Sequence, residues 1–233
     1  MNRLRLRGCW DEIVGLLVDG AQHTPGDAVE LGATLVEKST YTLDGWALAE
    51  DALRQAEQLA EDDRQLVGAV HSERALLYWA MTRHRVEDRG ADARTALAMA
   101  EEYLPLHSPR RRTLTFRRGL VVEYLDADPA GAVPHYEAAR QAARDGRDEL
   151  LASLSWRQLG SCAQAVDDVA TAAEAYREAL RAATSAGYLV GLAPALAALA
   201  EVAAPEEADR LRSEAGRLVS AFDGLPVWLA HLT

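Results

Sequence analysis

Apolar residues recur at helical spacing along almost the whole chain, and this periodicity limits the possible folds more than any other feature of the sequence. One face of the segment 169–183 illustrates it, with apolar side chains at Val169, Ala172, Ala173, Tyr176, Leu180 and Ala183. Alanine, the strongest helix former and a poor strand former, supplies about a fifth of the chain. We therefore predict an all-α protein.

Short breaks divide this pattern into separate helices. Asp128 before Pro129 is typical of a helix start, and so is Pro205, which two glutamates follow. Gly146 and Gly187 stand where helices are expected to stop. These signals predict helices at about 10–20, 27–38, 43–60, 64–83, 91–103, 109–125, 129–145, 148–166, 169–185, 188–203 and 206–222.

A triplet of small, large and small residues recurs in four of the predicted helices, and a weaker copy, Ala208, Arg212 and Ala215, lies in the last one. Its copies are Ala172, Tyr176 and Ala179; Ala132, Tyr136 and Ala139; Ala93, Leu97 and Ala100; and Ala49, Leu53 and Ala56. In the first of these copies, the preceding helix carries Trp156, Leu159 and Gly160. This order and spacing resembles the tetratricopeptide repeat, in a longer bacterial variant with repeats near 40 residues.

The resemblance implies a right-handed α-solenoid, a superhelix of about five antiparallel helix pairs over residues 27–222. An N-terminal cap helix would occupy residues 1–26, and an apolar C-terminal tail residues 223–233. The triplets and the residues 156, 159 and 160 would then be repeat-packing positions. The alternative is a plain bundle whose alanine-rich helices match the motif by chance.

The tail carries several large apolar side chains, at Leu225, Val227, Trp228, Leu229 and Leu232. They could seal the last helix pair, as terminal caps do in repeat proteins. They could instead dock on a second copy and form a homodimer.

Composition excludes several functional classes. The chain has 25 basic and 36 acidic residues, a net charge of −11, so we expect no nucleic-acid partner. No apolar stretch is long enough to cross a membrane. The two cysteines, Cys9 and Cys162, lie far apart and suggest reduced thiols in a cytoplasmic protein. No catalytic string, metal-binding pattern or cofactor fingerprint is recognisable, so we expect no metal or cofactor, and nothing requires an enzyme.

Three arginines occupy similar places on the first helices of successive pairs: Arg74, Arg117 and Arg157. In proteins that this chain resembles, first helices line the concave surface, so these guanidiniums would form a row along a groove. Arginine binds carboxylates through two parallel hydrogen bonds. With Tyr78 and Gln164 they make a candidate peptide-binding site for a protein or peptide partner that bears carboxylates.

The row of arginines has another explanation. The arginines could instead pair with local acids such as Glu73 and Glu123.

The function also has alternatives. The sequence predicts a regulatory or scaffold module, and the alternative is a small-molecule sensor, or an enzyme with a pocket inside the solenoid. A fragment resembling the sensor arms of bacterial transcription regulators is a third possibility. It would need a separate effector, because no DNA-reading helix-turn-helix is recognisable. A closed pocket with a buried ionisable pair would favour the sensor or enzyme, and an open channel the module.

Overall fold

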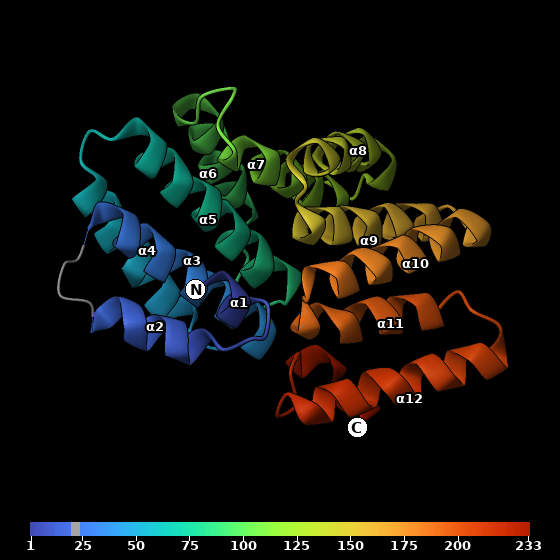
Figure 1. Ribbon diagram of the computed structural model, residues 1–233. Coiled ribbons are helices and arrows are strands. Elements are labelled where there is room, and N and C mark those ends of the chain that lie inside the picture. Colours follow the sequence, from blue (N-terminus) through green and yellow to red (C-terminus); the bar gives the residue numbers. More distant parts are fainter. Residues whose placement is uncertain (20–23) are drawn as a thin grey trace. The chain divides into compact units, whose positions relative to one another are not determined.

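The computed structural model describes residues 1–19 and 24–233, and all its regular structure there is helical (Figure 1). Residues 20–23, which include the expected end of the cap helix, lie outside the described residues. The α-helices are α1 (Asn2–Arg5), α2 (Trp10–Val18), α3 (Pro25–Thr42), α4 (Trp46–Ala60), α5 (Arg64–Arg83), α6 (Gly90–Tyr103), α7 (Arg110–Leu120), α8 (Pro129–Gly146), α9 (Glu149–Ala165), α10 (Val169–Ala186), α11 (Leu192–Ala200) and α12 (Pro205–Ala221). None of these helices is both long enough and apolar enough to span a bilayer.

The chain divides into two compact units. The first unit consists of Cys9–Ala127 with Met1 and Arg3–Arg5, and the second of Asp128–Thr233 with Asn2 and Leu6–Gly8. The division falls between the two predicted helices of the third pair. The predicted division into a cap at 1–26, a repeat region at 27–222 and a tail at 223–233 stays a prediction.

The first unit contains two antiparallel helix pairs, α3 with α4 and α5 with α6 (Figure 1). The first helices also pack on one another, α3 on α5 and α5 on α7. Leu53 and Leu77 are buried in its core, and Gly32 lets α3 approach α4 closely, because a Cβ at Gly32 would lie 2.6 Å from Leu53 Cδ2. Small residues at such contacts allow neighbouring helices to bury a common apolar face.

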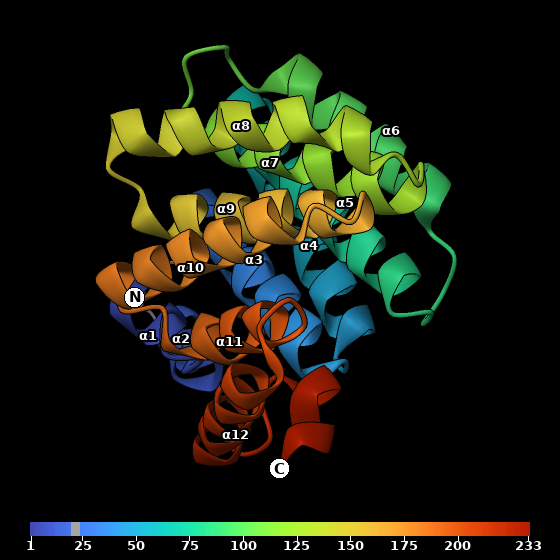
Figure 2. The same ribbon diagram turned by 90° about the vertical axis from the view of Figure 1, so that its right-hand side faces the viewer.

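The second unit, taken by itself, also packs its helices in chain order (Figure 2). Helix α8 packs on α9, α9 on α10, α10 on α11 and α11 on α12. Asp128, Asp148 and Asp168 cap α8, α9 and α10, and each carboxylate accepts a hydrogen bond from a backbone N–H in the first turn. The predicted fold class, an all-α array of antiparallel helix pairs, is confirmed.

Two predicted helices change character along their length. The helix predicted over 109–125 is α-helical only to Leu120 and continues as a π-helix, η1 (Val121–Leu125). The helix predicted over 188–203 begins with a 3₁₀ turn, η2 (Leu189–Gly191). Apolar spacing predicts a buried helical face, but it does not distinguish hydrogen-bond registers that differ by one residue.

The C-terminal tail packs inside its own unit. Its 3₁₀-helix η3 (Val227–Leu232) lies on α12, Leu229 is buried there, and a Cβ at Gly216 would lie 2.4 Å from the carbonyl oxygen of Leu232. Trp228 and Leu232 pack partly buried against the same cluster. The tail thus covers apolar surface of the last helix pair, and a homodimer through it stays a prediction.

Candidate functional site

Two of the three predicted groove arginines already bind acidic partners within the first unit. Arg74 Nη2 lies 2.8 Å from Glu57 Oε2. Arg117, with 8% of its side chain exposed, donates to Ser72 Oγ at 2.6 Å and to Glu73 Oε2 at 2.7 Å. The pairing with Glu73 is the alternative that the sequence left open, and a carboxylate ligand would have to compete with it.

Tyr78 is also engaged. It is buried, its hydroxyl donates to Glu50 Oε1 at 2.7 Å, and the Arg89 guanidinium lies 4.0 Å from the centre of its ring. Burial, together with the neighbouring Glu50 carboxylate, raises the pKa of the Tyr78 hydroxyl. The side chain therefore joins α4, α5 and the turn before α6.

Arg157 and Gln164 lie on α9 in the second unit. Arg157 is half-buried, and among the residues that the structure describes it has no ion-pair partner; its buried Nε has no hydrogen-bond acceptor. Gln164 Oε1 accepts a hydrogen bond from the Tyr176 hydroxyl at 2.8 Å. Of the predicted binding arginines, Arg157 is thus the one whose charge is not matched by a nearby carboxylate.

The predicted packing residues of the second unit gather along α8, α9 and α10. Six are buried: Ala132, Tyr136, Ala139, Ala172, Tyr176 and Ala179. Gly160 is buried against the Tyr176 ring, where a Cβ would lie 2.5 Å from a ring carbon. Leu159 and Trp156 are half-buried, and Trp156 has a second neighbour, the Arg140 guanidinium, 4.7 Å from its ring centre.

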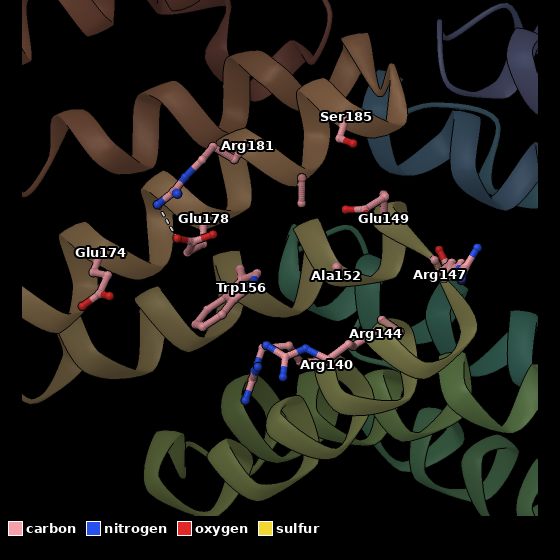
Figure 3. A pocket seen from close by; sticks show the side chains of 13 residues that line it. Arg140, Arg144, Arg147, Glu149, Ala152, Trp156, Glu174, Glu178, Arg181 and Ser185 are labelled. Carbon is pink, nitrogen blue, oxygen red and sulfur yellow. Dashed lines mark ion pairs between the residues drawn. The ribbon is translucent and has the colours of Figure 1, made fainter.

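Trp156 lies in an open hollow of about 550 Å³ that residues of α8, α9 and α10 line within the second unit (Figure 3). Arg140 and Arg144 lie one turn apart on the α8 wall, and Arg147 follows that helix directly. The α10 wall carries Glu174, Glu178 and Arg181 at the spacing of one helical face. Trp156 and Ala152 of α9 lie between the two walls (Figure 3).

The charges of this hollow are incompletely matched. Glu178 pairs with Arg181 on its own helix, whereas no ion pair joins Arg140, Arg144 or Arg147 to any carboxylate in the described part of the chain. Arg140 Nε is buried without an acceptor. Arg140 and Arg144 are four residues apart on α8, so their like charges repel each other and slightly destabilise that helix. A placement that costs stability in this way can mark a functional site.

Sequence reasoning missed these three arginines. The signal was present, because positions 140, 144 and 147 follow the spacing of one helical face. The resemblance to tetratricopeptide repeats points to the first helix of each pair instead, and it implies a packing role alone for Trp156. That α8 and α10 face each other across a hollow is a property of the packed helices.

Across residues 1–19 and 24–233, no group of three or more His, Cys, Asp or Glu side chains is placed to hold a metal ion. A second hollow, of about 880 Å³, lies in the first unit beside the turn 84–90, where Arg94 pairs with Asp126 at 2.6 Å. Most charged side chains of the α8–α10 hollow are exposed, so it is open to water.

The fold and the hollow define a helical protein of repeat-like antiparallel pairs with a polar surface site. No protein-family model matches the chain, and no curated protein matches it. Among solved structures it is similar to the crystal structure of BtubC (BKLC) from P. vanneervenii. The TM-score is 0.59 and the identity 20%, over 96% of this chain and 93% of that one. At this identity the likeness shows the fold alone.

Proposed function

We propose that this chain is a tetratricopeptide-like protein-binding module that takes an acidic peptide segment at the hollow between α8, α9 and α10. The observation that carries this proposal is the row formed by Arg140, Arg144 and Arg147, which has no ion-pair partner in the described residues. A buried guanidinium nitrogen without an acceptor costs free energy unless a ligand supplies one.

The rest of the hollow supports a peptide with two kinds of side chain. Arginine binds carboxylates through two parallel hydrogen bonds, which suits Asp, Glu or a chain terminus. The exposed part of Trp156, whose ring also contacts the Arg140 guanidinium, offers apolar area for a neighbouring side chain of the ligand. The Glu174 side of α10 repels the same carboxylates, so the two walls would fix the direction in which the segment lies.

The openness of the hollow favours a peptide over the alternative, a small-molecule sensor or enzyme. Its volume is within the range of ligand pockets, but such pockets bury most of their ligand's surface. Here Arg144, Arg147, Glu174 and Arg181 are exposed at the rim. A segment of a larger partner can cover an open rim, whereas a metabolite would stay largely in water.

The groove predicted from sequence takes a smaller part in this proposal. Arg157 and Gln164 on α9 remain candidates for a second contact with the same segment. The roles of Arg74, Tyr78 and Arg117 in binding, a cytoplasmic location and a regulatory role stay predictions.

The test is to pan a random peptide library displayed on phage against the full chain, and to measure the affinity of enriched peptides by fluorescence anisotropy. We expect enriched peptides to combine acidic residues with an aromatic or large apolar residue. Because Arg144 is exposed, Arg144→Glu should leave the far-UV circular dichroism unchanged while weakening binding more than about tenfold.

The matched control is Arg177→Glu, which makes the same charge change at an exposed position of α10 outside the hollow. It should bind the peptides as the wild type does. Enrichment without acidic residues, or equal loss of binding in both variants, would refute the proposed site.

A further inference from the structure

A single guanidinium, that of Arg5, is held by three side chains on one face of α3. Arg5 Nη2 donates to Thr34 Oγ1 at 2.8 Å and lies 2.8 Å from Glu30 Oε1. Its Nε lies 3.1 Å from Glu37 Oε2, in an ion pair without hydrogen-bond geometry. Glu30, Thr34 and Glu37 follow one another at the spacing of a helical face, so together they form a three-sided acceptor site, called here the α3 site.

The surroundings of the α3 site require a cation. Glu73 of α5, which pairs with Arg117, also acts on Glu37 electrostatically, so three carboxylates face two guanidiniums. Burial first, and then the charges of Glu73 and Glu30, raise the pKa of Glu37 to about 7 although Arg5 opposes this. Without Arg5 the carboxylates would be left crowded and poorly solvated.

The segment that supplies this cation is lightly attached. Helix α1 has only four residues, and none of them is buried. Apolar burial therefore contributes little to holding it in the first unit, where Arg5, whose side chain is 22% exposed, makes its side-chain contacts. Directly after it, the carbonyl oxygen of Leu6 accepts a hydrogen bond from Leu189 N–H inside the second unit. The few hydrogen bonds and ion pairs of one side chain hold the segment less firmly than the buried core holds the rest of the unit, which allows local opening while the rest of the unit stays folded.

We infer that the α3 site is a guanidinium-binding site that the chain's own N-terminal segment, residues 1–5, occupies as an intramolecular ligand. A second polypeptide that presents an arginine then competes with this segment. The inference rests on the proposed function only in treating the chain as a peptide-binding module. The α3 site is in the first unit and takes a basic ligand, whereas the hollow of the second unit takes an acidic one. An experiment can therefore refute the proposal for one site and support the proposal for the other.

The test uses a fluorescently labelled peptide of residues 1–8 in which Arg3→Gln and Arg7→Gln leave Arg5 as its basic side chain. Its affinity is measured by anisotropy for the full chain and for the full-length Arg5→Ala variant. Because a tethered ligand has an effective concentration of about 1 mM, the wild type should bind the peptide at least about tenfold more weakly than Arg5→Ala does.

Three comparisons make the result specific to the α3 site. The same peptide with Arg5→Gln should bind neither chain. Arg5→Ala combined with Glu30→Gln and Glu37→Gln should lose the peptide. Arg3→Ala, which removes an exposed arginine from the same helix, should behave as the wild type. Equal affinity of Arg5→Ala and wild type for the peptide, or equal binding of the Arg5→Gln peptide, would overturn the inference.

A second measurement tests the inference if the Arg5→Ala variant does not fold, as shown by loss of the helical circular dichroism signal. Trypsin cleavage after Arg5, followed by mass spectrometry, reports how often the segment leaves the α3 site. Glu30→Gln with Glu37→Gln should speed this cleavage several-fold, and Glu12→Gln, at an exposed position of α2, should leave it unchanged. An unchanged rate in the double variant would equally overturn the inference.

Discussion

At the scale of single residues, Glu37 couples the electrostatics of the first unit to pH. The pKa of Glu37 is raised to about 7 by burial, which outweighs the opposing charge of Arg5. A carboxyl group whose folded pKa lies above its unfolded value stabilises the fold fully below the unfolded value, near 4.5. That contribution is lost as the pH rises through about 7.

We therefore predict that Glu37→Gln changes the free energy of unfolding little at pH 5, where Glu37 is already protonated. At pH 8 it should stabilise the chain by about 2–3 kcal/mol relative to the wild type. Urea unfolding of both proteins at the two pH values measures the difference. Glu102→Gln, at an exposed position of α6, should shift the free energy by the same small amount at both. A Glu37→Gln effect that does not change with pH contradicts the prediction.

At the scale of secondary-structure elements, the contact between α9 and α10 depends on the missing side chain of Gly160. The Tyr176 ring fills the space that a Cβ would occupy, at 2.5 and 2.6 Å from two ring carbons. That ring is buried, and its hydroxyl is fixed by Gln164. A methyl group at position 160 would have to separate the two helices or move the ring.

We predict that Gly160→Ala destabilises the chain by about 1–3 kcal/mol in thermal or urea unfolding, although alanine is the better helix former. Gly15→Ala is the matched control, because Gly15 lies inside α2 with nothing within 4 Å of an added Cβ. It should be neutral or stabilising by up to about 1 kcal/mol. Equal effects of the two substitutions on the free energy of unfolding would show that the close approach of α9 and α10 at Gly160 does not contribute to stability.

At the scale of the whole molecule, the chain consists of two compact units whose helices pack mainly on their neighbours in sequence. In such an array, stability is approximately a sum of local terms and nearest-neighbour interfaces. Leu53 is fully buried between α3 and α4 in the first unit. Its loss should therefore be felt mainly by the helices that contact it.

We predict that Leu53→Ala, which should cost about 2–5 kcal/mol, lowers hydrogen-exchange protection in α3, α4 and α5 and leaves α11 and α12 unchanged. Mass spectrometry of exchanged peptides from these helices provides the measurement. A uniform loss of protection along the chain would show that the molecule unfolds as one cooperative body.

The sequence by itself determined the helices and their pairing in order. Propensity, apolar periodicity and capping residues such as Asp128 act within a few neighbouring positions, so they can be read without knowledge of the fold. The two-unit division and the π-helical end of the segment 109–125 were not predicted, because both depend on how whole helices pack.

Only the tertiary structure decided which charges are matched. Glu73 was one of several acids that could pair with the predicted groove arginines, but it is 44 residues from Arg117 in the chain, so no local pattern singles out this pair. The contact of Arg5 with the Thr34 hydroxyl likewise joins residues 29 apart. The row at 140, 144 and 147 was visible as a spacing, but its lack of carboxylate partners follows from what α8 faces. An ion pair depends on a separation of a few ångströms in space, and helix packing rather than sequence distance sets that separation.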